Sequence, residues 1–356
     1  MTPESKSELG ERIDRCLKRH KHAGVGIAYF ENGEIFWTSS HGFADLEKQL
    51  PVNDKTLFQA ASISKPVSAV AALRLVEEGA ICLDEDVNLK LKSWAIDDNG
   101  FQGKHKVTLR RLLNHSSGLN VSGFPGYLPA KPLPTALQIL NGEAPANTEA
   151  IKLHKEPGTG VSYSGGGYVV LQVLLSDITG KPYAEALSEL VLQPAGMAQS
   201  HFQQPLPQEA ATNAAQPYQS NGQAVAGGAR VYPELAAAGL WTTRCDLIQF
   251  GMEIQDSVTG RSRKLLSKRM ALEMLTPMEK TDGFGLGFRV HLKSQRISYF
   301  HSGMNEGYEC FMLVHSSPER GIAIMTNRQN SFPLIEKLAR IMMRSDHGYI
   351  PKLRRR

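Results

Sequence analysis

Apolar, β-branched runs lie near both ends of this 356-residue chain, and a long stretch with helical patterning separates them. On the N-terminal side, residues 25–31 and 33–40 flank Asn32-Gly33, a dipeptide typical of a tight hairpin turn. Near the other end, four such runs follow one another at residues 283–292, 297–303, 308–316 and 320–327. The pattern therefore predicts consecutive antiparallel strands contributed by both ends of the chain.

An amphipathic helix accompanies the strands at each end, because apolar residues share one helical face near the N-terminus and again within residues 333–344. Residues 86–261 have mainly helical patterns interrupted by loops rich in proline and glycine. We therefore predict an α/β (α+β) fold. Residues 1–85 and 262–356 form one domain, an antiparallel sheet flanked by the N- and C-terminal helices, and residues 86–261 form an inserted, mainly helical domain.

Composition narrows the classes of partner. The net charge is +5, but Lys352 to Arg356 supply four of the positive charges, so the body of the chain has no basic character that would indicate nucleic-acid binding. No apolar stretch reaches the roughly 18 residues of a membrane span. The N-terminus lacks the apolar core of a signal peptide, which predicts a cytoplasmic location, or an exported one if a leader has been lost. The four cysteines have no metal-binding spacing, so we expect no metal and no cofactor. The oligomeric state stays open.

Ser62 and Lys65 stand at the start of a long apolar segment, residues 66–76. Two residues three apart on a helix share one face, so the spacing places an amine beside a hydroxyl. A lysine at the start of a buried helix is desolvated and loses its proton more easily, which makes it a general base next to a nucleophile. The alternative is an ordinary N-cap serine, and on its own that alternative is favoured.

Two further short motifs carry suitable chemistry. Tyr163, in Tyr163-Ser164-Gly165, places a phenol that can exchange a proton near a cationic lysine. His301-Ser302-Gly303 lies late on a predicted strand, where a glycine allows close approach to the backbone. The alternatives are a buried tyrosine with a satisfied hydroxyl and a histidine at the end of a strand.

The order and spacing of these motifs resemble the serine β-lactamase and penicillin-binding protein superfamily. The similarity is to its class C-like branch, which includes D-stereospecific peptidases and β-lactamase-like esterases. It covers nearly the whole chain, through residues 57–79, 107–119, 156–175, 239–247, 282–290 and 301–308. The resemblance implies a β-lactamase/transpeptidase-like fold with the active site where the two predicted domains meet.

The resemblance also implies a role for each matched residue. Ser62 corresponds to the nucleophile that is acylated, Lys65 to its base or electrostatic partner, and Tyr163 to the tyrosine that carries protons. His301-Ser302-Gly303 corresponds to the Lys-Thr-Gly strand that aligns the substrate, and the backbone N–H groups of Ser62 and Met304 correspond to the oxyanion hole. Whether Lys65 or Tyr163 is the general base stays open.

Two departures from the family pattern affect the expected function. Gly165 stands where the family has an asparagine, and His301 stands where it has a lysine, so an amide and a fixed positive charge are missing. Both changes favour small esters or D-amino-acid-type amides as substrates of an acyl-serine hydrolase. A D-alanyl carboxypeptidase or β-lactamase, acting on amides or β-lactams, is a second hypothesis. A weakly active or inactive penicillin-binding or assembly module is a third.

Overall fold

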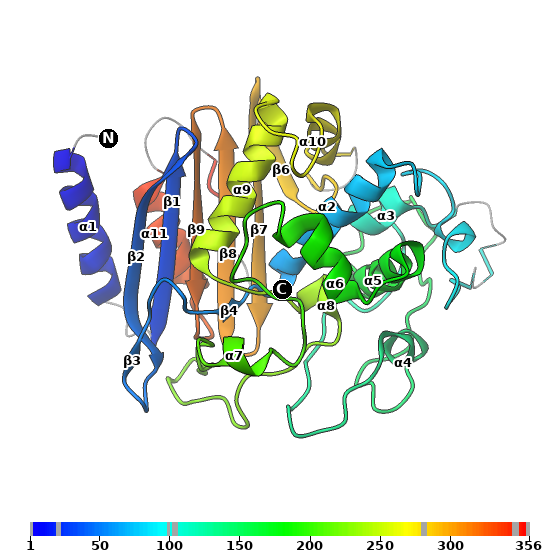
Figure 1. Cartoon of the computed structure of the whole chain (residues 1–356), viewed down its shortest axis with the longest axis horizontal. Helices are drawn as coiled ribbons and strands as arrows, with labels where there is room; N and C mark the ends of the chain where they lie inside the picture. Colours follow the sequence, from blue (N-terminus) through cyan, green and yellow to red (C-terminus); the bar gives the residue numbers. More distant parts are fainter. Residues whose placement is uncertain are drawn as a thin grey trace.

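The computed structural model describes residues 3–18, 23–97, 100–101, 106–278, 283–343 and 349–353. Its centre is a seven-stranded antiparallel sheet with the strand order β3-β2-β1-β9-β8-β7-β6 (Figure 1). The pairing of β1 with β9 joins strands from the two ends of the chain. The strands of this sheet are β1 (Gly24–Glu31), β2 (Glu34–Asp45), β3 (Leu50–Pro51), β6 (Arg289–Lys293), β7 (Arg296–Asn305), β8 (Tyr308–Ser316) and β9 (Glu319–Thr326).

Helices cover both faces of the sheet (Figure 1). On one face, α1 (Pro3–Lys18) and α11 (Phe332–Met342) pack against each other and share an apolar cluster with Val25 and Ile27 of β1. On the opposite face, α9 (Arg244–Thr259) packs on β1, β8 and β9. Because β1 is buried on both sides, its residues are apolar almost without interruption.

A mainly helical region lies beside the sheet, next to β6 and β7 (Figure 1). Its centre is the pair α2 (Ser64–Glu77) and α5 (Gly165–Thr179), which pack on each other and on the short helix α8 (Leu235–Ala238). The remaining helices are α3 (Leu109–Leu113), α4 (Ala136–Asn141), α6 (Tyr183–Leu187), α7 (Gln208–Ala211) and α10 (Lys268–Met274), with the short helical turns Ala61–Ile63, Val87–Leu89 and Ser188–Leu192. A two-stranded pair, β4 (Phe58–Gln59) with β5 (Trp241–Thr242), completes the fold.

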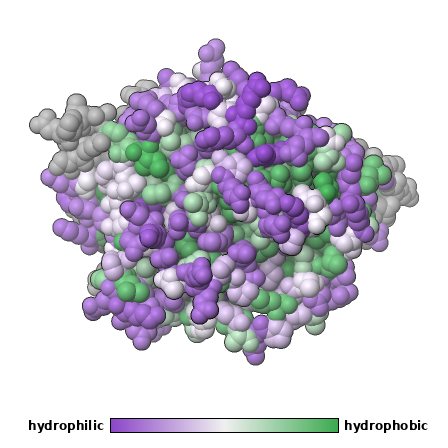
Figure 2. Space-filling view, viewed as in Figure 1, coloured by the Kyte–Doolittle hydropathy of each residue, from purple (hydrophilic) through white to green (hydrophobic). Residues whose placement is uncertain are grey.

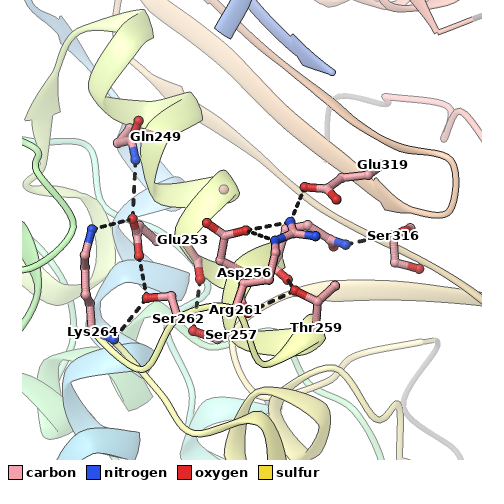
Figure 3. Close-up of polar contacts among 12 residues, drawn as sticks. Gln249, Glu253, Asp256, Ser257, Thr259, Arg261, Ser262, Lys264, Ser316 and Glu319 are labelled. Carbon is pink, nitrogen blue, oxygen red and sulfur yellow. Dashed lines mark hydrogen bonds and ion pairs between the residues drawn. The ribbon is translucent and has the colours of Figure 1, made fainter. Parts of the chain in front are cut away.

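A network of polar side chains fastens the end of α9 to its surroundings (Figure 3). The buried Glu253 carboxylate accepts from the Ser262 hydroxyl at 3.1 Å and from the Lys264 ammonium at 3.3 Å. Arg261, which follows the end of α9, forms ion pairs with Asp256 of α9 and with Glu319 at the start of β9. These bonds fix the register of α9 against the turn between β8 and β9. We call this group of side chains the α9 network.

Hydrophilic residues cover most of the face seen in Figure 2, and hydrophobic residues appear between them in separate patches. Such scattered apolar residues are normal for a protein surface in water. Within the described residues, no helix combines the length and the apolar character that crossing a membrane requires.

The predicted fold class is confirmed: an antiparallel sheet built from both ends of the chain, with flanking terminal helices. The prediction of strand over residues 283–292 is wrong for its first part, because β6 begins only at Arg289. Gly283 and Gly287 have φ of +79° and +96°, which takes the backbone out of the extended conformation. Gly287 also packs so closely on α2 that an added Cβ would lie 2.7 Å from that of Ala69.

The predicted division between the sheet domain and residues 86–261 stays a prediction. One part of it differs from the structure: α9 belongs to the inserted segment in sequence but packs on the sheet. Its apolar side chains gave no sign of which neighbour they would contact. The last three of the basic residues near the C-terminus, Arg354 to Arg356, lie outside the described residues.

Candidate active site

The turn that carries Ser62 is held on both sides. Ala61, directly before it, is completely buried and has φ of +49°, an unusual conformation for a residue with a side chain. The Ala60 N–H donates to the Leu240 carbonyl at 2.8 Å. On the other side, the Ser64 hydroxyl donates to the Ala61 carbonyl at 2.6 Å. A strained residue persists only where its surroundings fix it, and strain of this kind is typical of functional sites.

Lys65 is 2% exposed and lies directly behind Ser62. Its Nζ donates to the Ser62 hydroxyl at 3.2 Å and to the Ala237 carbonyl of α8 at 2.8 Å. It also lies 5.0 Å from the centre of the Tyr163 ring and 5.6 Å from that of Tyr168, within the range of cation–π attraction. No ion pair to Lys65 occurs among the described residues. A buried amine with only neutral partners is an unusual arrangement, and it is the one that acyl transfer needs beside a nucleophile.

Tyr163 is positioned through the buried His115. The backbone N–H groups on both sides of Tyr163 bond to this one residue: Ser162 donates to the His115 carbonyl at 2.8 Å, and Ser164 donates to its Nδ1 at 3.2 Å. The two rings are 4.2 Å apart between centroids, with planes tilted by 34°. Because Nδ1 accepts this bond, it carries no proton. His115 therefore fixes both the backbone and the ring of the candidate proton carrier.

His301, Ser302, Gly303 and Met304 lie on β7, next to the turn that carries Ser62. The His301 Nδ1 donates to the Ser302 carbonyl at 2.7 Å, which orients the ring. A Cβ on Gly303 would lie 2.2 Å from the Ala60 carbonyl oxygen. The glycine is thus required because the backbone of the Ser62 turn approaches the strand here, a reason that differs from the substrate contact expected from the sequence.

These residues meet at one cavity of about 270 Å³. We call it the serine cavity. It is lined by Ser62, Ser122, Gly123, Tyr163, Phe284, Arg289, Phe300, His301, Ser302, Gly303, Met304 and Phe332. Apart from Lys65, which lies behind Ser62, every residue that the sequence predicted for the site lines this cavity. The lining comes from both predicted domains.

Arg289 is the charged one among the lining residues that sequence reasoning missed; the others are Ser122, Gly123, Phe284, Phe300 and Phe332. It is the first residue of β6 and pairs with Phe300, the neighbour of His301 on β7. Its guanidinium carbon lies 4.4 Å from the centre of the Phe284 ring. The signal that could have found it is the GFGLGFR run itself, since its glycines turn the chain just before this arginine. The cavity therefore has a permanent positive charge that His301 alone does not provide.

The position of Gly165 leaves no room for the asparagine of the family pattern. A Cβ at this residue would lie 2.8 Å from the ring of Phe124 and 3.2 Å from the Ser122 carbonyl oxygen. Phe124 thus fills the space next to Gly165, and no local pattern predicts this contact between residues more than forty positions apart.

A second, more polar cavity of about 520 Å³ lies on the other side of Tyr163 and shares Ser122, Gly123 and Tyr163 with the first. Its wall includes Thr148, Glu149, His154 and Ser162. Among the described residues, no three His, Cys, Asp or Glu side chains are grouped so as to hold a metal ion.

A family model described as Beta-lactamase matches residues 9–343. The chain belongs to the beta-lactamase family. Among curated relatives, Protein flp of Staphylococcus aureus (strain N315) is 24% identical over 356 residues, which cover 95% of this chain and 66% of that protein. The chain thus spans just under two thirds of this relative's length.

Two solved structures illustrate the shared fold of the beta-lactamase family. The beta-lactamase/D-alanine carboxypeptidase of Pseudomonas syringae has a TM-score of 0.76 at 19% identity and covers 96% of this chain and 99% of its own. The D-amino acid amidase of Ochrobactrum anthropi SV3, complexed with D-phenylalanine, has a TM-score of 0.70 at 22% identity and covers 95% and 100%. At these identities the likeness shows the fold alone.

Proposed function

We propose that this protein is a serine hydrolase that acts through an acyl-serine intermediate on small esters or D-amino-acid-type amides. The observation that carries the proposal is the contact between the Lys65 Nζ and the Ser62 hydroxyl at 3.2 Å, next to a cavity that Tyr163 also lines. A nucleophile, a buried amine and a phenol are the groups that acyl transfer requires.

The proposed reaction has two halves. The Ser62 oxygen adds to the substrate carbonyl carbon while its proton passes to Lys65 or Tyr163. The bond to the leaving group breaks, and the leaving alcohol or amine takes up a proton. Water then adds to the acyl-serine, the bond to Ser62 breaks, and the acid is released with the hydroxyl restored. The backbone N–H groups of Ser62 and Met304 are the proposed donors to the oxyanion.

The serine cavity supports a small substrate with an apolar part. Three phenylalanine rings, those of Phe284, Phe300 and Phe332, line its wall. Gly165 removes an amide that would bind an acylamino group, so an ester or a simple amide places fewer demands on the site. The second cavity beyond Tyr163 offers room for a longer, polar part of the substrate.

A specific observation favours a second candidate, a D-alanyl carboxypeptidase or β-lactamase. Arg289 supplies the cavity with a positive charge that can pair with the carboxylate of a peptide or β-lactam. The solved structure from Pseudomonas syringae bears the name of such an enzyme. Turnover of nitrocefin measured beside turnover of p-nitrophenyl butyrate separates the two candidates.

The substitution Ser62→Ala tests the proposal. We expect turnover of p-nitrophenyl butyrate to fall by about 10⁴-fold or more, and labelling by a fluorescent fluorophosphonate to disappear. The folded state should be unchanged, as judged by the midpoint of urea unfolding. Residual turnover above a tenth of the wild-type rate would reject Ser62 as the nucleophile. A wild-type protein that neither labels nor turns over any ester, amide or β-lactam would support the inactive-module hypothesis instead.

A further inference from the structure

Residues 233–240, which contain α8, bond directly to the groups that form the site. The Ala237 carbonyl accepts from the Lys65 Nζ at 2.8 Å, which is the shorter of the two hydrogen bonds of this amine. The Leu240 carbonyl accepts from the Ala60 N–H at 2.8 Å, two residues before Ser62. Any shift of this segment therefore moves the partner of Lys65 and the turn of Ser62 together.

Glu234 lies at the start of this segment and is completely buried. It occupies the N-cap position of α8, yet its side chain makes no capping bond. Neither carboxyl oxygen has a hydrogen-bond partner within 3.5 Å among the residues that the structure describes. Its backbone carbonyl is well engaged and accepts from the N–H groups of Ala237 and Ala238 at 3.1 and 2.9 Å. The residue is thus tied to α8 by its main chain, while the Tyr127 hydroxyl is the donor that acts on its carboxyl group.

The groups that face this carboxyl are neutral. The Tyr127 hydroxyl, from the loop before α4, lies close enough to lower the pKa of Glu234. Tyr232, two residues before Glu234, lies close enough for a charge on Glu234 to raise the pKa of its own hydroxyl. Two charged residues near the Tyr232 hydroxyl, Arg230 and Glu306, pair with each other at 2.6 Å. From α5, the side chain of Gln172 bonds the backbone of Pro233 and Ala236 on either side of Glu234.

Burial raises the pKa of Glu234 from its ordinary value to about 7, and the Tyr127 hydroxyl offsets only part of that rise. A carboxylate without close donors in an apolar interior is strongly disfavoured, so the neutral acid is the form that fits this site. Lys65 lies on the other side of α8, joined to it through the Ala237 carbonyl.

We infer that Glu234 is a positioning residue for Lys65 and acts in its neutral form, because only an uncharged side chain lets the start of α8 stay buried. When the carboxyl loses its proton, the charge is drawn toward water or toward the Tyr127 hydroxyl. Because Glu234 is the first residue of the segment, that movement displaces α8 and draws the Ala237 carbonyl away from the Lys65 Nζ. Lys65 then loses its shorter hydrogen bond, and the attack of Ser62 slows. The inference rests on the proposed function.

The test compares the pH dependence of wild-type protein with that of Glu234→Gln and Glu234→Met, which replace the acid by neutral side chains of similar size. The measurements are kcat/KM for p-nitrophenyl butyrate and the rate of fluorophosphonate labelling at Ser62, from pH 6 to pH 9. We expect the ratio of variant to wild-type rate to rise at least tenfold from pH 6 to pH 9. The reason is that only about 1% of the Glu234 carboxyl in the wild-type protein is neutral at a pH two units above its pKa. Two variants are used because the test needs only one of them to fold.

A ratio that stays flat from pH 6 to pH 9 would overturn the inference, while labelling that depends on Ser62 would leave the proposed function intact. Labelling or turnover that survives Ser62→Ala would instead reject the proposed function, whatever the ratio. A purely structural role for Glu234 would lower the rates of the variants equally at every pH. Tyr127→Phe is the matched control: it removes the facing hydroxyl, and we expect it to make the ionisation of Glu234 occur at higher pH.

Discussion

Two regions of the molecule bury glutamate side chains in opposite ways. In the α9 network, the carboxylate of Glu253 accepts hydrogen bonds from Ser262 and from the ammonium of Lys264 (Figure 3). Glu234, at the start of α8, is even more deeply buried, and neither of its carboxyl oxygens has a hydrogen-bond partner within 3.5 Å among the described residues. Glu309 on β8 follows the first pattern, with its carboxylate accepting from three consecutive N–H groups at 2.7–2.8 Å before α11.

The cations of the two regions differ in the same way, although Arg261 is exposed and Lys65 is buried. Arg261 in the α9 network pairs with two carboxylates, whereas Lys65 beside the cavity bonds only a hydroxyl and a carbonyl. A charge paired with its opposite is fixed in one state, and it stabilises the position of an element. The comparison indicates that ion pairs hold the sheet side of the molecule, whereas the buried Lys65 and Glu234 of the cavity side lie among neutral groups.

The largest effect that follows from this comparison is a loss of turnover rate with no loss of folding stability. Tyr163→Phe removes the phenol hydroxyl and keeps the ring, whose centre lies 5.0 Å from the Lys65 Nζ and which packs on His115. We expect kcat to fall by about 10²–10⁴-fold, the range for loss of an acid–base group. The midpoint of urea unfolding should stay unchanged, which serves as the control. An unchanged rate would show that Tyr163 has only a packing role.

The pH dependence of stability gives the next effect. Since burial raises the pKa of Glu234 to about 7, the folded state holds its proton at pH values where the unfolded state has lost it. Stability is therefore fully present below about pH 4.5 and falls as the pH rises toward 7, where the loss levels off. The size is on the order of 3 kcal/mol. Urea unfolding of wild type and Glu234→Gln at pH 5 and pH 8 measures it, and we expect the variant to lack this decrease. Parallel pH profiles would contradict the prediction.

The sequence predicted much of this arrangement, and it failed where a contact joins distant parts of the chain. The contact between Ser62 and Lys65 could be predicted because a spacing of three on a helix is a local property. The strands near both ends of the chain could be predicted because β-branched runs and a hairpin turn are local features as well. Glu234 could not be predicted, because nothing near it in the chain tells whether it faces water or a tyrosine. The glycines before Arg289 indicate a turn, but they do not tell which cavity the arginine faces. The packing of Phe124 against Gly165 is of the same kind.

A moderate effect on stability without rate should follow from a change in the α9 network. Glu253→Ala leaves the Ser262 hydroxyl and the Lys264 ammonium without their shared acceptor. We expect the free energy of unfolding to fall by about 1–3 kcal/mol, the range for loss of hydrogen bonds to a charged group. Turnover of p-nitrophenyl butyrate by the folded fraction should be unchanged. A loss of rate larger than the loss of folded protein would break the distinction between the two regions.

The smallest effect concerns the substrate and not the acyl-transfer chemistry. Arg289 lines the serine cavity and lies over the Phe284 ring, so its charge can pair with a carboxylate on the substrate. Arg289→Gln should lower kcat/KM for a carboxylate-bearing substrate such as nitrocefin by about tenfold, the effect of one charge-assisted hydrogen bond. It should leave a neutral ester within about twofold of wild type, because such a substrate has no carboxylate with which the guanidinium could pair. Arg289→Lys keeps the charge but loses the planar fork, so its kcat/KM for the carboxylate-bearing substrate should lie between those of wild type and Arg289→Gln. If both substrates lose the same factor, Arg289 supports the shape of the cavity, and His301 must then be considered alone as the group that meets the carboxylate.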